Sequence, residues 1–313
     1  MNTYYPSYYG RFACAASDCP DSCCAQWEIV IDDNTYRFYM NEPGEFADKV
    51  RSCIIEDDDG DHCFRLLDGR CPFLNKEGLC DIHISLGEEH TCSVCREHPR
   101  FTEEYDGFTE ISLSLSCPEA CDLICASPLS RTTYPVPVSD GTDELLDELI
   151  RYRAAVIDTV VRKGANTAAA ELLGYALKLQ SEIDEDEYEF DVDYKMLFGK
   201  DWFNFLLNET EILTDEWKNI LTECIGKEAL SGISFENTEK LFAYFVYRYG
   251  LKAINDEDVI GYAFYILSAV CTSSVIAENT NVSLEEAARL FSKETEHDPD
   301  NIELMRDYLC SFF

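Results

Sequence analysis

Residues 14–24 read CAASDCPDSCC, and this cysteine-dense run marks the first of two chemically different parts of the chain. Thirteen of the 16 cysteines lie between Cys14 and Cys125, so thiol chemistry is concentrated in the first part. Residues 126–142 carry three prolines and a glycine without a helical period, which indicates a partly extended strap. We therefore expect a cysteine-rich metal-binding domain over 1–125, a proline-rich linker over 126–142 and a helical domain over 143–313.

The N-terminal residues indicate the cellular compartment, which in turn bears on the chemistry of the cysteines. Residues 1–12 have no basic stretch followed by an apolar run, so they do not have the form of a secretory signal. We expect a cytoplasmic protein on this ground. Cytoplasmic thiols are kept reduced, so the clustered cysteines are predicted to bind metal rather than to form disulfides.

The formal net charge of −36 excludes one large class of partner. Nucleic-acid binding rests on basic side chains that neutralise phosphates, and the sequence has no basic stripe. An acidic surface instead suits a lysine-bearing protein partner by electrostatic steering, although plain solubility charge is the more common explanation of such a surface.

A long uncharged segment, residues 259–277, has the length of a membrane span. It contains several Ser, Thr and Tyr residues, and no Lys or Arg lies close to its ends to anchor it at an interface. We expect a buried helix of a soluble domain and no membrane association.

The second part of the chain has the pattern of an all-α domain. Apolar residues recur every three or four positions over 143–163, and further helices are expected over 167–180 and 237–249. Ser283 and Glu286 have the form of a capping box before another helix. The first part shows only short extended pieces, at 27–32 and 108–115, and little continuous core. The fold class is therefore mainly α, and metal coordination is expected to stabilise the irregular first part.

The prediction of a metal site rests on four groups of cysteines. Soft thiolates at close spacing select zinc, copper(I) or iron–sulfur clusters over hard cations. The candidate ligands are Cys14, Cys19, Cys23, Cys24, Cys71, Cys80, Cys95 and Cys117. Iron–sulfur clusters are typically held by cysteine alone, and Cys71 and Cys117 are each followed by proline, as in ferredoxin-type ligation. We favour an iron–sulfur cluster of the 4Fe-4S type.

Zinc is the alternative metal, because it accepts mixed cysteine and histidine ligands. Four of the five histidines share the cysteine-rich segment, and Cys92 with Cys95 forms a C-x2-C pair. These histidines are His62, His83, His90 and His98.

Three further expectations concern individual cysteines. Neighbouring side chains point to opposite faces of extended backbone, so Cys23 and Cys24 are expected to diverge, one to bind metal and the other to pack. Cys53 and Cys63 are expected to pack as small buried hydrophobes. Cys117, Cys121 and Cys125 have the spacing that places side chains on one face of a helix.

Several of these motifs together resemble the flagellin lysine-N-methylase family. They are Tyr5-Pro6, Phe12, Cys14, Cys19, Cys23-Cys24 with Trp27, CPFLNKEGLC at 71–80, Cys95 with Pro99-Arg100, and LSLSCPE at 113–119. The resemblance implies transfer of methyl from S-adenosylmethionine to lysine Nε of flagellin or another lysine-bearing protein, by an enzyme that holds an iron–sulfur cluster.

The residues themselves add only partial support for that chemistry. The sequence has no G-x-G, so the Gly-rich turn of a Rossmann-type methyltransferase is missing. An aromatic face favours a sulfonium and an arginine holds a carboxylate bidentately, which makes Trp27 and Arg100 candidate cofactor contacts. Roles as an ordinary core residue and an ordinary surface residue are equally open for them.

No catalytic base is assigned from the sequence, although a carboxylate or tyrosine must accept the proton of the lysine amine. The alternative function is a non-enzymatic zinc- or iron–sulfur-binding module with a helical protein-interaction domain.

Overall fold

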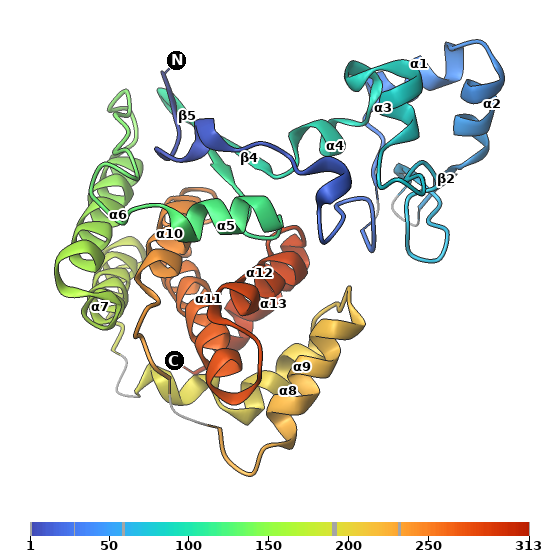
Figure 1. Cartoon of the computed structure of the whole chain (residues 1–313). Helices are drawn as coiled ribbons and strands as arrows, with labels where there is room; N and C mark the ends of the chain where they lie inside the picture. The colour runs from blue at the N-terminus through green and yellow to red at the C-terminus, as the bar shows by residue number, and fades with distance from the viewer. Residues whose placement is uncertain (1, 28, 58–59, 190–192, 231–232, 313) are drawn as a thin grey trace. The chain divides into compact units, whose positions relative to one another are not determined.

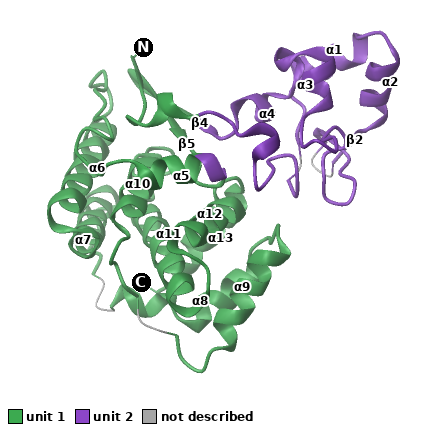
Figure 2. Cartoon of the chain, in the orientation of Figure 1, with its two compact units in different colours: residues 1–12, 102–116, 120–313 green, residues 13–101, 117–119 purple. Residues whose placement is uncertain are grey.

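The computed structural model describes residues 2–27, 29–57, 60–189, 193–230 and 233–312. The chain divides into two compact units. Unit 1 comprises residues 1–12, 102–116 and 120–313, and unit 2 comprises residues 13–101 and 117–119 (Figure 2). The division therefore differs from the expected one, because parts of the first 125 residues belong to the helical unit.

Backbone pairing explains why unit 1 recruits the N-terminus. Strand β1 (Asn2–Tyr4) pairs in parallel with β5 (Phe108–Leu113), which in turn neighbours β4 (Arg100–Tyr105). The Ser7 amide donates to the Thr133 carbonyl at 2.8 Å. Ala126 ends helix α5 (Pro118–Ala126), and residues 127–142 contain neither helix nor strand, as predicted for a strap, but they lie inside unit 1 rather than between two units.

Unit 1 is mainly helical (Figure 1). Its helices are α5 (Pro118–Ala126), α6 (Glu144–Lys163), α7 (Ala165–Asp184), α8 (Lys200–Glu209), α9 (Asp215–Gly226), α10 (Glu239–Tyr249), α11 (Val259–Asn279), α12 (Leu284–Thr295) and α13 (Pro299–Cys310). Short 3₁₀ turns occur at Tyr9–Arg11, Tyr194–Phe198 and Lys252–Ile254.

The helices predicted from local sequence signals are confirmed. The Asp143 carboxylate caps α6 by accepting from the Leu146 amide at 3.0 Å, and the Ser283 hydroxyl caps α12 by accepting from the Glu286 amide. Both bonds satisfy amides that a helix N-terminus otherwise leaves without a partner.

Helix α11 forms the centre of unit 1, where it packs against α7, α10, α12 and α13. It is the one helix among the described residues that is long and apolar enough to cross a membrane, and 94% of its most apolar window is buried inside the protein. Its polar groups have internal partners; for example, Thr272 Oγ1 accepts from the Trp202 indole at 2.8 Å. The predicted buried helix is therefore confirmed.

Unit 2 has short elements and a core of its own. The elements are α1 (Asp33–Asn41), α2 (Glu45–Ser52), β2 (Ile54–Glu56), β3 (His62–Phe64), α3 (Asp81–Leu86) and α4 (Ser93–Glu97), with 3₁₀ turns at Ala16–Asp18 and Glu88–His90. Ile29, Ile31, Tyr39, Val50, Phe64, Phe73 and Ile82 form its buried centre together with two cysteines, Cys71 and Cys92. The expectation of little continuous core was wrong, because these apolar residues come from segments too far apart to show a local pattern.

Candidate functional site

All eight candidate metal ligands belong to unit 2. Cys121 and Cys125 belong to unit 1, where they lie one turn apart on α5 and share a hydrogen bond. Cys63 is buried in β3 and Cys53 packs against the core of unit 2, as predicted. Unit 2 is therefore the thiol-rich part of the chain.

The Cys23 and Cys24 side chains do not diverge as expected. They lie in a turn rather than in extended backbone, and their sulfur atoms form a hydrogen bond. That hydrogen bond lowers the pKa of Cys24 to about 7, with help from Ser22 and the Arg70 guanidinium. One thiol of this interacting pair therefore loses its proton more readily than an isolated cysteine, and the thiolate is the form that binds metal.

Cys24 is joined to the Cys71–Cys80 loop by the backbone. The Cys71 amide donates to the Cys24 carbonyl at 2.8 Å, and Leu74 forms a β-bridge with Cys80. Burial raises the pKa of Cys71 to about 12, and the charges of Cys24, Cys80 and Cys95 add to the shift. The thiols of Cys24, Cys71, Cys80 and Cys95 therefore lie close enough for the charge of one to affect the pKa of another, and we call this group one electrostatic neighbourhood.

Cys92 belongs to the same neighbourhood, although it was not among the candidate ligands. It is 1% exposed and hydrogen-bonded to Cys95, and this bond is the main cause of the raised pKa of Cys95. The C-x2-C spacing of Cys92 and Cys95 was the signal that could have identified it.

The Cys14–Cys19 segment is one of the parts of the constellation that reach the protein surface. Cys14 is exposed, and its sulfur accepts from the Ala16 amide at 3.4 Å. Burial raises the pKa of Cys19, whose thiol donates to the Asp21 carbonyl, and the neighbouring Cys14 charge raises it further. Cys117 is half-buried.

The chemistry of this donor set fits a thiophilic metal or an iron–sulfur cluster. Within the described ranges, however, no three His, Cys, Asp or Glu side chains are arranged to hold a single metal ion. The assignment of individual cysteines as ligands therefore stays a prediction, for which the shared neighbourhood of Cys24, Cys71, Cys80 and Cys95 is the structural support.

The histidines that favoured zinc have other contacts. His62 stacks on Tyr36 and His90 stacks on Phe38, each with ring centroids 3.8 Å apart. His98 meets Trp27 edge to face at 5.8 Å. Packing therefore accounts for three of the four rings without a metal.

The two candidate cofactor contacts lie in unit 2. Trp27 is half-buried, and its contact with His98 places it beside the Pro99-Arg100 motif. Arg100 opens β4 and is half-buried. Trp27 and His98, which are 71 positions apart in sequence, are thus in contact, whereas the joint role of Trp27 and Arg100 stays a prediction.

A hollow of about 440 Å³ opens in unit 2 between two of the cysteine motifs. Ser17 lines it from the Cys14–Cys19 segment, and Arg70 with residues 74–78 lines it from the CPFLNKEGLC loop. The Gln26 amide donates to the Gly69 carbonyl at 2.7 Å. Trp27 directly follows Gln26 in sequence, and the lining residue Arg70 directly follows Gly69. The volume is in the range of small-molecule sites.

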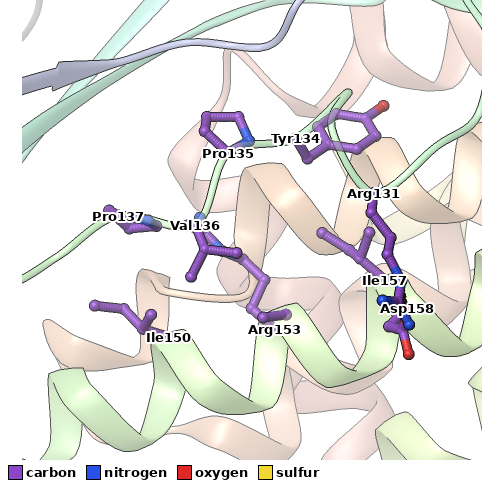
Figure 3. Close-up of a pocket in the computed structure, with 10 residues that line it drawn as sticks. Arg131, Tyr134, Pro135, Val136, Pro137, Ile150, Arg153, Ile157 and Asp158 are labelled. Atoms are coloured by element: carbon purple, nitrogen blue, oxygen red, sulfur yellow. Dashed lines mark ion pairs between the residues drawn. The ribbon is translucent and has the colours of Figure 1, made fainter.

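Unit 1 has a smaller pocket, of about 280 Å³, between the strap and α6 (Figure 3). Ile150 and Ile157 form its apolar wall, and an ion pair of Arg131 with Asp158 closes one end. Arg153 also lines it, but its guanidinium is bound to Glu110. The pocket has no cysteine among its lining residues, and we assign no cofactor to it.

The LSLSCPE motif contributes to a second polar cluster, in unit 1, that the sequence did not predict. Ser116 Oγ lies 2.9 Å from His297 Nε2, and Ser114 Oγ lies 3.3 Å from the buried carboxylate of Glu296. Tyr244 donates to the same carboxylate at 2.9 Å. The alternation of Ser112, Ser114 and Ser116 with apolar residues was the signal. Ser114 and Ser116 are buried, and their hydroxyls have hydrogen-bond partners in this cluster.

Comparison with known proteins gives three relatives from Salmonella. The lysine-N-methylase of Salmonella typhimurium is 29% identical over 129 residues, which are 39% of this chain and 32% of that protein. The flagellar biosynthetic protein FliU of Salmonella muenchen is 28% identical over 129 residues, 76% of its length. The lysine-N-methylase of Salmonella choleraesuis is 28% identical over 129 residues, 32% of its length.

The predicted resemblance to the lysine-N-methylases is confirmed. The match spans about a third of the length of the two lysine-N-methylases. No family model matches the chain, and no solved structure matches it.

Proposed function

We propose that this protein is a lysine N-methyltransferase that transfers methyl from S-adenosylmethionine to lysine side chains of flagellin or another protein in the cytoplasm. The observation that carries the proposal is the similarity over 129 residues to two proteins named lysine-N-methylase. The name of the related FliU protein, a flagellar biosynthetic protein, supports a flagellar substrate.

The reaction sets the requirements for the site. The neutral Nε of lysine attacks the methyl carbon, the bond from that carbon to the sulfonium sulfur breaks, and the ammonium product releases a proton to an acceptor. In the proposed site the face of Trp27 stabilises the cationic sulfonium, and Arg100 binds the cofactor carboxylate. The contact of Trp27 with His98 supports a common site for these two residues.

We further propose that the cysteines of unit 2 hold an iron–sulfur cluster, with zinc as the alternative. Cys24, Cys71, Cys80 and Cys95 are the ligands that the mutual pKa effects support best. Such a group would fix the cysteine-bearing segments relative to one another, rather than carry the methyl group.

The test is an assay with anaerobically purified protein, labelled S-adenosylmethionine and flagellin. Label should appear on lysine, and a flagellin whose surface lysines are replaced by arginine should receive none. Iron, zinc and sulfide contents are measured on the same preparation. If a fully metal-loaded protein transfers no label, the non-enzymatic metal-binding module becomes the better assignment.

A further inference from the structure

One face of α8 and one face of α13 form a groove in unit 1. Both helices are remote in sequence from the cysteine motifs. The volume of the groove is about 620 Å³. The residues that line it are Asp201, Asn204, Phe205, Asn208, Glu209, Leu304, Asp307 and Tyr308. They recur every three or four positions on each helix, so they form two continuous helical faces.

The floor of the groove is aromatic. The Phe205 and Tyr308 rings stack with centroids 4.2 Å apart and planes 22° apart. Trp202 lies beneath them, 5.5 Å from Phe205, and is fully buried, so it holds the pair in place. Leu304, 42% exposed, extends the apolar surface along α13.

The rim of the groove is acidic. Asp201, Glu209 and Asp307 are exposed, and among the described residues none of these carboxylates forms an ion pair with a Lys, Arg or His. Arg306, the cation of α13, is committed to Asp256 and Asp258 instead. No basic side chain lines the groove.

We propose that this groove binds a basic segment of a partner protein, with a lysine side chain laid along the Phe205–Tyr308 pair and its ammonium group among the rim carboxylates. An aromatic floor accommodates the methylene stem of lysine and attracts its cation, and carboxylates without partners provide the complementary charge. An apolar partner would leave those carboxylates desolvated without compensation, which disfavours it. The proposal goes beyond methyl transfer and does not rest on it.

Binding is measured on the full-length protein by fluorescence anisotropy, with no S-adenosylmethionine present. The probe is a fluorescein-labelled peptide of alternating lysine and serine, and the matched probe has glutamine in place of lysine. The lysine peptide should bind and should weaken as salt rises, and the glutamine peptide should not bind.

Two variants locate the binding. Asp201→Asn with Asp307→Asn should weaken it by up to about 25-fold, since each exposed pair contributes up to about fivefold. Phe205→Leu keeps an apolar floor but removes the π face, and should weaken binding by about two- to fivefold. Glu285→Gln with Glu216→Gln removes the same charge from exposed positions outside the groove and should leave affinity unchanged.

Three results would overturn the proposal. Equal weakening by the two double variants would assign the binding to overall surface charge. Equal affinity for the lysine and glutamine peptides would point to an apolar partner. Concentration-dependent dimerisation that Phe205→Leu abolishes, without peptide binding, would identify a second copy of this chain as the occupant.

Discussion

The Arg153 guanidinium in α6 binds the Glu110 carboxylate in β5 through two hydrogen bonds, at 2.7 and 2.6 Å. Both side chains are nearly inaccessible to solvent, with 3% and 6% exposure. A third bond runs from Arg153 to the Tyr247 carbonyl at 3.0 Å. This buried pair ties the strand that precedes the strap to the helix that follows it.

Replacing Glu110 with alanine should destabilise unit 1 by about 3–5 kcal/mol, because it leaves a buried guanidinium without its counter-charge. Urea unfolding followed by circular dichroism measures the loss. The control is Glu182→Ala, which breaks the exposed pair with Lys178 and should cost no more than about 1 kcal/mol. Equal losses in the two variants would show that the buried pair has no special structural role.

The same pair shows why the domain boundary could not be predicted from sequence. Helix ends have local signals, such as Asp143 before α6 and Ser283 before α12, and these helices were predicted. The pairing of Arg153 with Glu110, and of β1 with β5, joins residues far apart in sequence and leaves no periodic pattern. A proline-rich strap predicts irregular backbone, but it does not predict whether two units meet there.

The cysteine region shows a similar limit. Spacing identified the thiol-rich segment, and unit 2 contains all eight candidate ligands. The mutual orientation of Cys23 and Cys24 depended on the backbone between them, which is a turn rather than extended. The ring partners of the histidines, Tyr36 and Phe38, also came from elsewhere in the chain and could not be inferred from spacing.

Asp32 joins two elements of unit 2. Its carboxylate caps α1 by accepting from Thr35, and it also accepts from the Ser93 amide at the start of α4, at 2.9 Å. Asp32→Ala should therefore destabilise unit 2 by about 1–2 kcal/mol, as loss of a helix cap does. Asp33→Ala, which removes an exposed carboxylate next to it, is the control and should change the unfolding free energy little.

Asp32 should also contribute to acid sensitivity. Burial by itself raises the pKa of Asp32, but the hydrogen bonds from Ser93 and Thr35 prevail and lower it to about 2. Because the pKa is lower in the folded state, the ionised carboxylate stabilises the fold at pH values above its ordinary pKa of about 4. This contribution is lost as the pH falls from about 4 to about 2. Asp32→Asn should flatten the unfolding free energy over that window; an unchanged pH profile would contradict the assignment.

Glu294 should have the opposite pH dependence. This carboxyl is 1% exposed, and burial raises its pKa to about 7 although Leu213 and Thr214 donate hydrogen bonds to it. The folded state then holds a proton that the unfolded state has released, so stability falls as the pH rises from about 4.5 to about 7, by up to about 3 kcal/mol.

The measurement for Glu294 is the unfolding free energy across that pH range. Glu294→Gln should remove most of the decline, whereas Glu285→Gln, an exposed change on the same helix, should not. Burial also raises the pKa of Glu296, so a residual decline of the same sign should persist in Glu294→Gln. A full decline in that variant would show that Glu294 is not the titrating group.

Cys71→Ser should lower the metal content of the purified protein and its methylation of flagellin together, because it removes a thiol from the centre of the proposed ligand group. Cys53→Ser is the matched control, since Cys53 also packs against the core of unit 2 but lies outside the cysteine motifs. Iron, zinc and sulfide are quantified for both variants after anaerobic purification. Normal metal content in Cys71→Ser would remove this residue from the ligand set.

Changes at Trp27 and Arg100 should separate cofactor binding from metal binding. Trp27→Phe weakens the aromatic face and should reduce affinity for S-adenosylmethionine by about two- to fivefold. Arg100→Lys loses the bidentate geometry and should reduce it by about tenfold or more, since hydrogen bonds between charged groups contribute about 1.5–3 kcal/mol.

Calorimetric titration measures affinity, and metal content should stay normal in both variants because neither side chain is a thiol donor. Arg131→Lys, in the strap of unit 1, is the control and should bind as the unchanged protein does. If Trp27→Phe and Arg100→Lys bind the cofactor normally, the two residues have only packing and surface roles.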